Sequence, residues 1–355
     1  MKRIFKMALA LILGAGILTG CSSNGNPSQA TPTPEEGCKI RVGLVTDTGG
    51  VDDKSFNQST WEGVTRFAAD NGISDECISY LQSTGDSDYI PNLSQFADEE
   101  YDLIIATGYL FAQAIDSVSA NYADRNFLFI DEVSENANVA SATFAAEQGS
   151  FLVGVAAATV AIEEGSNTVG FIGGMEGPLI GAFQAGFEQG VLAVNPDIKI
   201  LVDYCASFED ASIGQSLAVK QYNAGATVIY QAAGAAGNGV IKEAKERGDV
   251  WAIGVDKDQY EEGMKEDGTS VILTSMIKRV DQASNMTAQA VLDNQFQGGI
   301  VHFDLTNDGV GAELTAGRNL TDEWIAIIND YATKIKAGEI TVSPDAVIPN
   351  GSSNK

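Results

Sequence analysis

The chain has 355 residues, 44% of them hydrophobic, so it is long enough to bury more than one apolar core. Its 48 acidic residues outnumber its 21 basic residues and give a formal net charge of −27 at pH 7. A surface this negative repels phosphate backbones and anionic lipid headgroups, so the composition argues against nucleic acid or another polyanion as a ligand.

The first twenty residues have the pattern of a secretion signal. Residues 2–6 carry three basic side chains, residues 7–17 are apolar, and Leu-Thr-Gly-Cys at 18–21 ends a small-residue cleavage site in cysteine. This pattern resembles a bacterial lipobox, which implies acylation of Cys21 and a lipid anchor at the extracytoplasmic face of the cell membrane. An ordinary signal peptide with a chance cysteine is the alternative.

The chain after the signal divides into a tether and a folded part. Residues 21–37 contain no large apolar side chain after Cys21, and we expect a flexible tether there. Residues 38–355 are too many for one simple core and are typical of two lobes. No other apolar run approaches the length of a membrane span, so we expect this part to fold outside the membrane.

Short strands alternate with helical segments along the folded part. Residues 40–45 form a β-branched run, and the helix after it has Ser55 as its expected N-cap and Trp61, Val64, Phe67 and Ala68 on one face. Further strands are expected at 78–81, 102–107, 126–131, 139–144, 167–172, 198–204, 227–231, 250–255, 271–274 and 299–305, and further helices at 89–100, 111–122, 179–194, 212–224, 239–247, 281–295 and 322–337. The alternation predicts the α/β class, with two parallel sheets and right-handed crossovers.

Two cysteines occupy equivalent places before the first two strands. Cys38 immediately precedes the first strand and Cys77 the second. Because these strands should be parallel neighbours, the two cysteines should lie side by side and form a disulfide in an oxidising exterior. Cys205 would remain as a buried, small apolar side chain.

The turn after the first strand is the first candidate binding element. Asp47 to Asp53 is a glycine-broken turn with three carboxylates, and it leads into a helix. Open α/β sheets bind ligands at such carboxyl ends of strands, so its polar residues are candidates for contacting a small molecule. Asp52 and Asp53 have an alternative role, as caps of the following helix or as solvated side chains.

An ordered series of turns carries a family resemblance. The run Thr-Asp-Thr-Gly-Gly-Val-Asp-Asp-Lys-Ser-Phe-Asn at 46–57 resembles the first motif of the basic membrane protein family, the nucleoside-binding lipoproteins that serve ABC importers. The other matching motifs are ATGY at 106–109, with Tyr109 in place of the usual phenylalanine, FID at 129–131, GGM at 173–175, AFQAGF at 182–187, SFED at 207–210, AGAAGNG at 233–239, GVDKDQ at 254–259 and SMIK at 275–278.

The resemblance implies an architecture and a cleft. The family has the type I periplasmic-binding-protein fold, in which three crossovers form a hinge and the ligand lies between two lobes. The crossovers would fall near Phe144, Thr274 and Gly298. The first lobe would then comprise 38–144 plus 275–298, and the second 145–274 plus 299–350.

The resemblance also implies a nucleoside ligand, with purine preferred, and an ABC permease as partner. Phe56 and Phe208 would stack on the base, since aromatic faces stack on bases at about 1–3 kcal/mol each. Ordinary core packing is the alternative for each of these two rings. Asp256 and Lys278 would hold the ribose, Asp131 would contact the base edge, and Asp47 and Asn57 would complete the first-lobe contacts. Gly234 belongs to the glycine-rich turn of the same site. No catalytic residue, metal or cofactor is implied.

Enzymes and other binding proteins are the competing classes of protein for this sequence. His302 is the single histidine, and the sequence has no cysteine–histidine metal spacing, no G-x-S-x-G elbow and no phosphate-binding P-loop. A nucleoside hydrolase would need a calcium-binding aspartate cluster, for which only the Asp47–Asp53 turn is a candidate. A sugar- or autoinducer-binding protein, or the ligand-binding partner of a membrane sensor, would share the same fold and remains an alternative.

Overall fold

The computed structural model describes residues 38–355, which form one compact unit. The predicted signal peptide at 1–20, the tether at 21–37 and the acylated Cys21 lie outside the described residues. Within residues 38–355, no helix is both long and apolar enough to cross a membrane.

The first sheet has six parallel strands in the order β11-β5-β4-β3-β1-β2. Alternate residues of its strands point to opposite faces, so Leu44 packs with α1 and α8 while its neighbour Val45 packs with α2 and α3. We call this sheet with these helices the first lobe. Its elements are β1 (Val42–Thr46), α1 (Phe56–Asn71), β2 (Ile78–Gln82), α2 (Tyr89–Asp98), β3 (Leu103–Thr107), α3 (Ala112–Asn121), β4 (Asn126–Ile130), β5 (Val139–Phe144), α8 (Val280–Leu292) and β11 (Gly299–Phe303).

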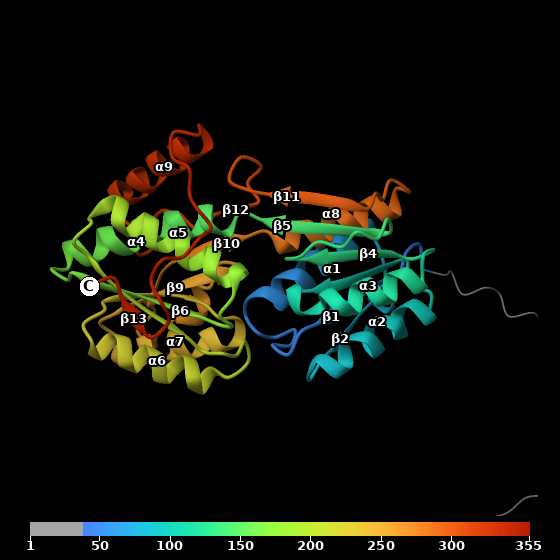
Figure 1. Cartoon of the computed structure of the whole chain (residues 1–355), viewed down its shortest axis with the longest axis horizontal. Coiled ribbons are helices and arrows are strands. Elements are labelled where there is room, and N and C mark those ends of the chain that lie inside the picture. The colour runs from blue at the N-terminus through green and yellow to red at the C-terminus, as the bar shows by residue number, and fades with distance from the viewer. Residues whose placement is uncertain (1–37) are drawn as a thin grey trace, which may run out of the picture. The chain divides into compact units, whose positions relative to one another are not determined.

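The second sheet has seven strands in the order β12-β10-β9-β8-β6-β7-β13, with antiparallel strands at both edges. Helices α4, α5 and α9 pack on one face and α6 and α7 on the other, and together they form the second lobe (Figure 1). Its elements are α4 (Ala146–Glu163), β6 (Thr168–Gly173), α5 (Pro178–Val194), β7 (Lys199–Tyr204), α6 (Ala211–Asn223), β8 (Val228–Ala232), α7 (Gly237–Arg247), β9 (Trp251–Asp256), β10 (Ile272–Lys278), β12 (Val310–Ala312), α9 (Asp322–Lys336) and β13 (Ser352–Ser353).

The chain passes between the lobes three times, as predicted, but two of the predicted boundaries are wrong. Strand β10 stays paired with β9 as far as Ile277, so residues 275–278 belong to the second sheet and not to the first lobe. Strand β11 pairs in parallel with β5, so residues 299–303 belong to the first sheet and not to the second lobe. In Figure 1 the orange β11 lies beside the green β5, at the edge that α8 leads back to. That edge offers unpaired backbone groups, which β11 satisfies.

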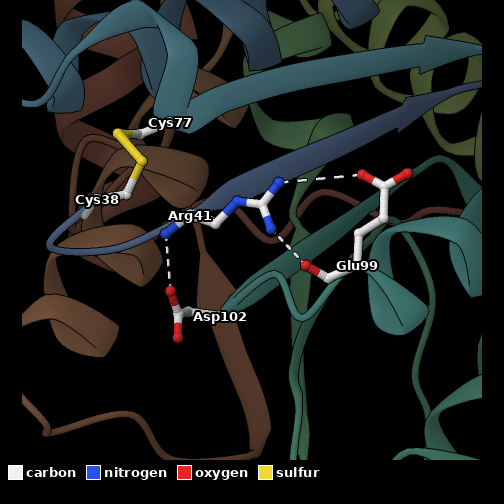
Figure 2. Close-up of a disulfide and its surroundings, with 5 residues drawn as sticks. All are labelled: Cys38, Arg41, Cys77, Glu99 and Asp102. Carbon is white, nitrogen blue, oxygen red and sulfur yellow. Dashed lines mark hydrogen bonds and ion pairs between the residues drawn. A yellow bond between two sulfur atoms is a disulfide. The ribbon is translucent and has the colours of Figure 1, made fainter. Parts of the chain in front are cut away.

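The disulfide between Cys38 and Cys77 joins the starts of two neighbouring strands. Val42 of β1 is paired with Ile78 of β2, and the Cα atoms of the two cysteines lie 5.6 Å apart. Figure 2 shows the bond beside Arg41, whose backbone N–H donates to an Asp102 carboxylate oxygen at 2.7 Å. Among the described cysteines Cys205 stands outside a disulfide, and burial raises the pKa of its thiol to about 12.

Candidate functional site

A cleft lies between the carboxyl ends of the strands of the two lobes. It holds about 570 Å³ of empty space, part of it open to solvent. All eight residues predicted to bind ligand line it, from Asp47 in the first lobe to Lys278 at the end of β10. The lining residues are Asp47, Gly49, Asp53, Phe56, Asn57, Gly108, Tyr109, Leu110, Asp131, Leu179, Ile180, Phe183, Phe208, Ala232, Gly234, Val255, Asp256 and Lys278.

The Asp53 side chain, and not that of Ser55, accepts the free amides at the start of helix α1. Asp53 Oδ1 accepts the backbone N–H groups of Ser55 at 2.9 Å and Gln58 at 3.0 Å, and its Oδ2 accepts the backbone N–H of Asn57 at 2.9 Å. These are unpaired amides of the first helical turn, which a carboxylate satisfies well. Ser55 occupies the N-cap position as predicted, but its hydroxyl makes no capping hydrogen bond and donates instead to Asp256 of the second lobe.

Asp47 and Asn57 form the polar end of the first-lobe wall. Asn57 Nδ2 donates to Asp47 Oδ1 at 2.8 Å, and the Gly49 amide donates to the same oxygen at 2.9 Å. Burial raises the pKa of Asp47 to about 6 in spite of these bonds. Within the described chain, Asn57 Oδ1 is buried without a hydrogen-bond partner. A ligand that donates a hydrogen bond would satisfy this oxygen.

A buried ion pair joins the two lobes at the hinge side of the cleft. Lys278 Nζ lies 2.5 Å from Asp131 Oδ2, and the two side chains are 2% and 4% exposed. Burial raises the pKa of Asp131, and the Lys278 ammonium opposes that shift. The other carboxylate oxygen, Asp131 Oδ1, is buried and accepts no hydrogen bond from any residue of 38–355.

Three phenylalanine rings surround the Lys278 ammonium. Its Nζ lies 4.7 Å from the ring centroid of Phe56, 5.0 Å from that of Phe144 and 5.4 Å from that of Phe183. The negative faces of aromatic rings attract a cation at these distances. The lysine is therefore held by both lobes, since Phe56 and Phe144 come from the first and Phe183 from the second.

The two aspartates that end strands β4 and β9 share an unusual backbone conformation. Asp131 has φ 75° and Asp256 has φ 68°, in the left-handed region that non-glycine residues seldom occupy. Such strain costs of the order of 1–3 kcal/mol and persists where the surrounding structure enforces it. In both lobes it turns the chain at the strand end and leaves a carboxylate in the cleft. Burial raises the pKa of Asp256 to about 6.

Aromatic rings from both lobes meet at the cleft. Phe56 is contributed by the start of α1 and Phe208 by the turn after β7. The Phe208 ring packs so closely on Gly174 that a Cβ there would lie 2.3 Å from it. Tyr109 of the first lobe approaches Phe208 edge to face, with ring centroids 6.4 Å apart. The two lobes thus contact each other through rings as well as through the ion pair.

Direct hydrogen bonds also join the lobes beside the cleft. Asn238 Nδ2 donates to the Asp53 carbonyl at 2.9 Å, and Gln259 Nε2 donates to the Lys54 carbonyl at 2.8 Å. Lys257 Nζ lies 2.5 Å from a Glu62 carboxylate oxygen. The turn that the sequence singled out therefore holds α1 and meets the second lobe, in addition to lining the cleft.

Sequence reasoning missed several lining residues. Tyr109 belongs to the ATGY turn, where it replaces the usual phenylalanine, but it was not predicted to bind the ligand. Leu179, Ile180 and Phe183 lie on the first turns of α5, at a spacing that also fits core packing, and no local signal separates the two roles.

The fold is that of a two-lobed binding protein, with a cleft between the lobes. The match of residues 40–345 to the model of the ABC transporter substrate-binding protein PnrA-like family shows that the chain belongs to that family. It is therefore a substrate-binding transport protein by family.

Two curated relatives and one solved structure span nearly the same length as this chain. It is 39% identical to a CD4+ T-cell-stimulating antigen of Listeria innocua, over 96% of this chain and 98% of that protein. It is 35% identical to the ABC transporter nucleoside-binding protein BmpA of Lactococcus lactis, over 96% and 99%. A solved ABC transporter solute-binding protein from Aeropyrum pernix superposes with a TM-score of 0.73, at 26% identity, over 85% of this chain and 92% of that one.

Proposed function

We propose that the protein captures a nucleoside, preferably a purine nucleoside, in the interlobe cleft and delivers it to the permease of an ABC importer. One observation carries the proposal: the cleft combines an aromatic ring from each lobe with buried oxygens of Asn57 and Asp131 that no residue of the described chain satisfies. A buried unpaired acceptor costs about 1–3 kcal/mol. A nucleoside supplies a flat base for the rings and N–H and O–H donors for the oxygens.

The charges of the cleft favour a nucleoside over a nucleotide. Four carboxylates line it, those of Asp47, Asp53, Asp131 and Asp256, and within the described chain Lys278 is the one cation among the lining residues. Its ammonium is already bonded to Asp131. A phosphate group would add negative charge to this low-dielectric site without a free cation to balance it.

Each polar residue is proposed to contact one part of the ligand. Asp256 and Lys278 would hold the ribose, because a carboxylate accepts two hydrogen bonds and suits vicinal hydroxyls. Asp47 and Asn57 would contact the base edge. Asp131 was predicted to contact the base edge. Its carboxylate is bonded to Lys278 at 2.5 Å, and we therefore assign it to the ribose end.

The relatives support this choice of ligand. The Lactococcus lactis relative is named as a nucleoside-binding protein of an ABC transporter, and it aligns over almost the full length of both chains. The fold alone is shared with sugar-binding proteins, so the ligand has to be tested directly.

Calorimetry with matched ligands tests the proposal. We expect inosine to bind, 2′-deoxyinosine to bind about tenfold to a hundredfold more weakly because a buried Asp256 oxygen loses its donor, and hypoxanthine to bind more weakly still. Inosine monophosphate and D-arabinose serve as controls for the charge and sugar alternatives. Equal affinities for inosine, 2′-deoxyinosine and hypoxanthine would refute the ribose contact, and tighter binding of the sugar would replace the proposed ligand class. Conversion of inosine to hypoxanthine during incubation would indicate hydrolysis.

We propose that Cys21 anchors the protein to the membrane. Acyl chains on this cysteine would supply the membrane affinity, so Cys21→Ala should leave the protein in the soluble exported fraction or as uncleaved precursor. Fatty-acid labelling of the alanine variant would contradict this. Nucleoside uptake in strains with and without the permease would distinguish transport from sensing.

A further inference from the structure

The segment from Val342 to Lys355 runs along the second lobe, from the end of the helical region around α9 to strand β13. Val342 and Ile348 are buried in the apolar core of this lobe. Ser352 and Ser353 form the short strand β13, which pairs antiparallel with β7 and covers the edge of the sheet (Figure 1). Asn354 continues the contact, since its side chain accepts the backbone N–H of Ile200 at 2.9 Å. We call residues 342–355 the strap.

Two buried polar side chains of α5 hold the strap. Glu188 accepts the backbone N–H groups of Val347 at 3.1 Å and Ile348 at 3.2 Å. Gln184 donates to the Ile348 carbonyl at 2.7 Å and to Glu188 Oε1 at 2.5 Å. Both side chains are 2% exposed. Without the strap, Glu188 would lose two of its donors, and burial of its carboxylate would then be unfavourable.

Gln184 and the strap are also bonded to Tyr204, the last residue of β7. The Tyr204 hydroxyl donates to Gln184 Oε1 at 2.6 Å, and the Tyr204 backbone N–H donates to Asn350 Oδ1 of the strap at 3.1 Å. Asn350 also donates to Glu176, in the loop between β6 and α5, at 3.1 Å. The strap is therefore connected to three elements that lead to the cleft.

Two of these elements, α5 and β7, lead to a lining residue nearby. Ile180 lies one turn before Gln184 on α5, and Phe208 lies four residues after Tyr204. The Tyr204 ring packs against Gly173, where a Cβ would lie 2.5 Å from the ring and 2.9 Å from Ile180. Displacement of Tyr204 would allow Ile180 and the Phe208 turn to move as well, because the side chains around Gly173 are packed without free space between them.

We propose that the strap is a positioning element for the second-lobe wall of the ligand cleft, acting through Gln184 and Tyr204. The strap is bonded to Gln184 of α5 and to Tyr204, which precedes the Phe208 turn. Through these bonds it fixes the positions of α5 and of the turn. The choice of nucleoside as the probe ligand rests on the proposed function, whereas the positioning role itself does not.

Two shortened chains separate positioning from the simple covering of a sheet edge. A chain that ends at Ala346 loses the contacts to Glu188, Gln184 and Tyr204, and we expect about a tenfold loss of inosine affinity or more. A chain that ends at Asn350 keeps these contacts and loses β13, the residues after it and the bond from the Gly351 amide to the Val202 carbonyl, so its affinity should stay within about twofold of the parent. Binding is measured well below the melting temperature of each chain, where a loss of stability alone does not change affinity.

A point substitution tests the same connection with the strap in place. Tyr204→Phe removes the hydroxyl bonded to Gln184 and should weaken inosine binding several-fold. Tyr331→Phe is its matched control, because the Tyr331 hydroxyl donates to the Ala193 carbonyl, at 3.2 Å, on the far side of the lobe. Should the chain ending at Ala346 fail to fold, the comparison of these two variants decides the proposal. Equal affinities for both would overturn it.

Hydrogen exchange of the ligand-free protein provides a readout that does not depend on the ligand. In the chain ending at Ala346, amides of residues 174–183 and 204–208 should exchange faster, while those of β8 keep the parent's protection. Unchanged exchange at the wall, or faster exchange throughout the second sheet, would overturn the positioning role. If the parent binds no nucleoside, the proposed function fails, and the exchange pattern still decides the role of the strap.

Discussion

Replacement of Lys278 by methionine should destabilise the protein strongly and abolish ligand capture. Methionine keeps an apolar side chain among the rings of Phe56, Phe144 and Phe183 but removes the ammonium. Asp131 Oδ2 would then lose its cation. Asp131 Oδ1 already has no hydrogen-bond partner within residues 38–355, so the buried carboxylate would be left uncompensated. Removal of one member of a buried pair typically costs about 3–5 kcal/mol.

The size of the effect should depend on pH and on the fate of Asp131. In the Lys278→Met variant the pKa of Asp131 rises further, since burial is no longer opposed. A carboxyl group with a raised folded-state pKa favours the folded state when protonated, so the loss of stability should grow as the pH rises above the unfolded value of about 4. The double variant Lys278→Met/Asp131→Leu should recover at least about 2 kcal/mol, because apolar replacement of a whole buried pair is often neutral or stabilising.

Urea unfolding at pH 5 and pH 7 checks this reasoning. Lys334→Met is the matched control, since the Lys334–Asp330 pair is solvent-exposed and its loss should leave stability close to that of the parent. Calorimetry with inosine on the same proteins should show no binding by either Lys278 variant. A cost below about 1 kcal/mol for Lys278→Met at pH 7, or a double variant no more stable than the single one, would refute the account of the pair.

Three further outcomes follow from the structure. Phe208→Ala should weaken inosine binding about tenfold or more while leaving the fold intact, and equal affinity by calorimetry would exclude stacking on this ring. Thiol titration of the denatured, unreduced chain without Cys21 should detect Cys205 alone; three thiols would contradict the disulfide. Asp47, with its pKa raised from 3.8 to about 6, should make unfolding easier as the pH rises through that range, so Asp47→Asn should flatten the pH profile measured by urea unfolding.

The strand–helix alternation predicted the α/β class, the family resemblance implied the hinged two-lobed architecture, and the errors of the prediction have physical causes. Helix α4 was absent from the sequence-based assignment because it is buried on nearly all sides, so its small and apolar residues show no polar face and no helical period. Strand β11 was recognised as a strand but placed in the wrong sheet. Its residues satisfy a strand pattern equally well at either edge, and the return of α8 to the first lobe decides the pairing.

The candidate site could be predicted where a motif coincided with a strand end. Asp131 follows β4 directly and Asp256 is the last residue of β9, and the carboxyl ends of parallel strands meet at one edge of a sheet. The pairing of Asp131 with Lys278 could not be predicted, because the two residues belong to different lobes and meet only through the hinge. Their contact depends on the relation between two sheets, which local patterns do not contain.

The turn at Asp53–Ser55 shows how tertiary structure selects among local possibilities. A serine before a helix is a good cap, and an aspartate two residues earlier is another, so the sequence permits both. The structure uses Asp53 for the helix amides and thereby releases the Ser55 hydroxyl to reach Asp256 in the second lobe. Asn238 and Gln259 bind the backbone of the same turn. One short segment therefore joins the start of α1, the first-lobe wall and the contact between the lobes.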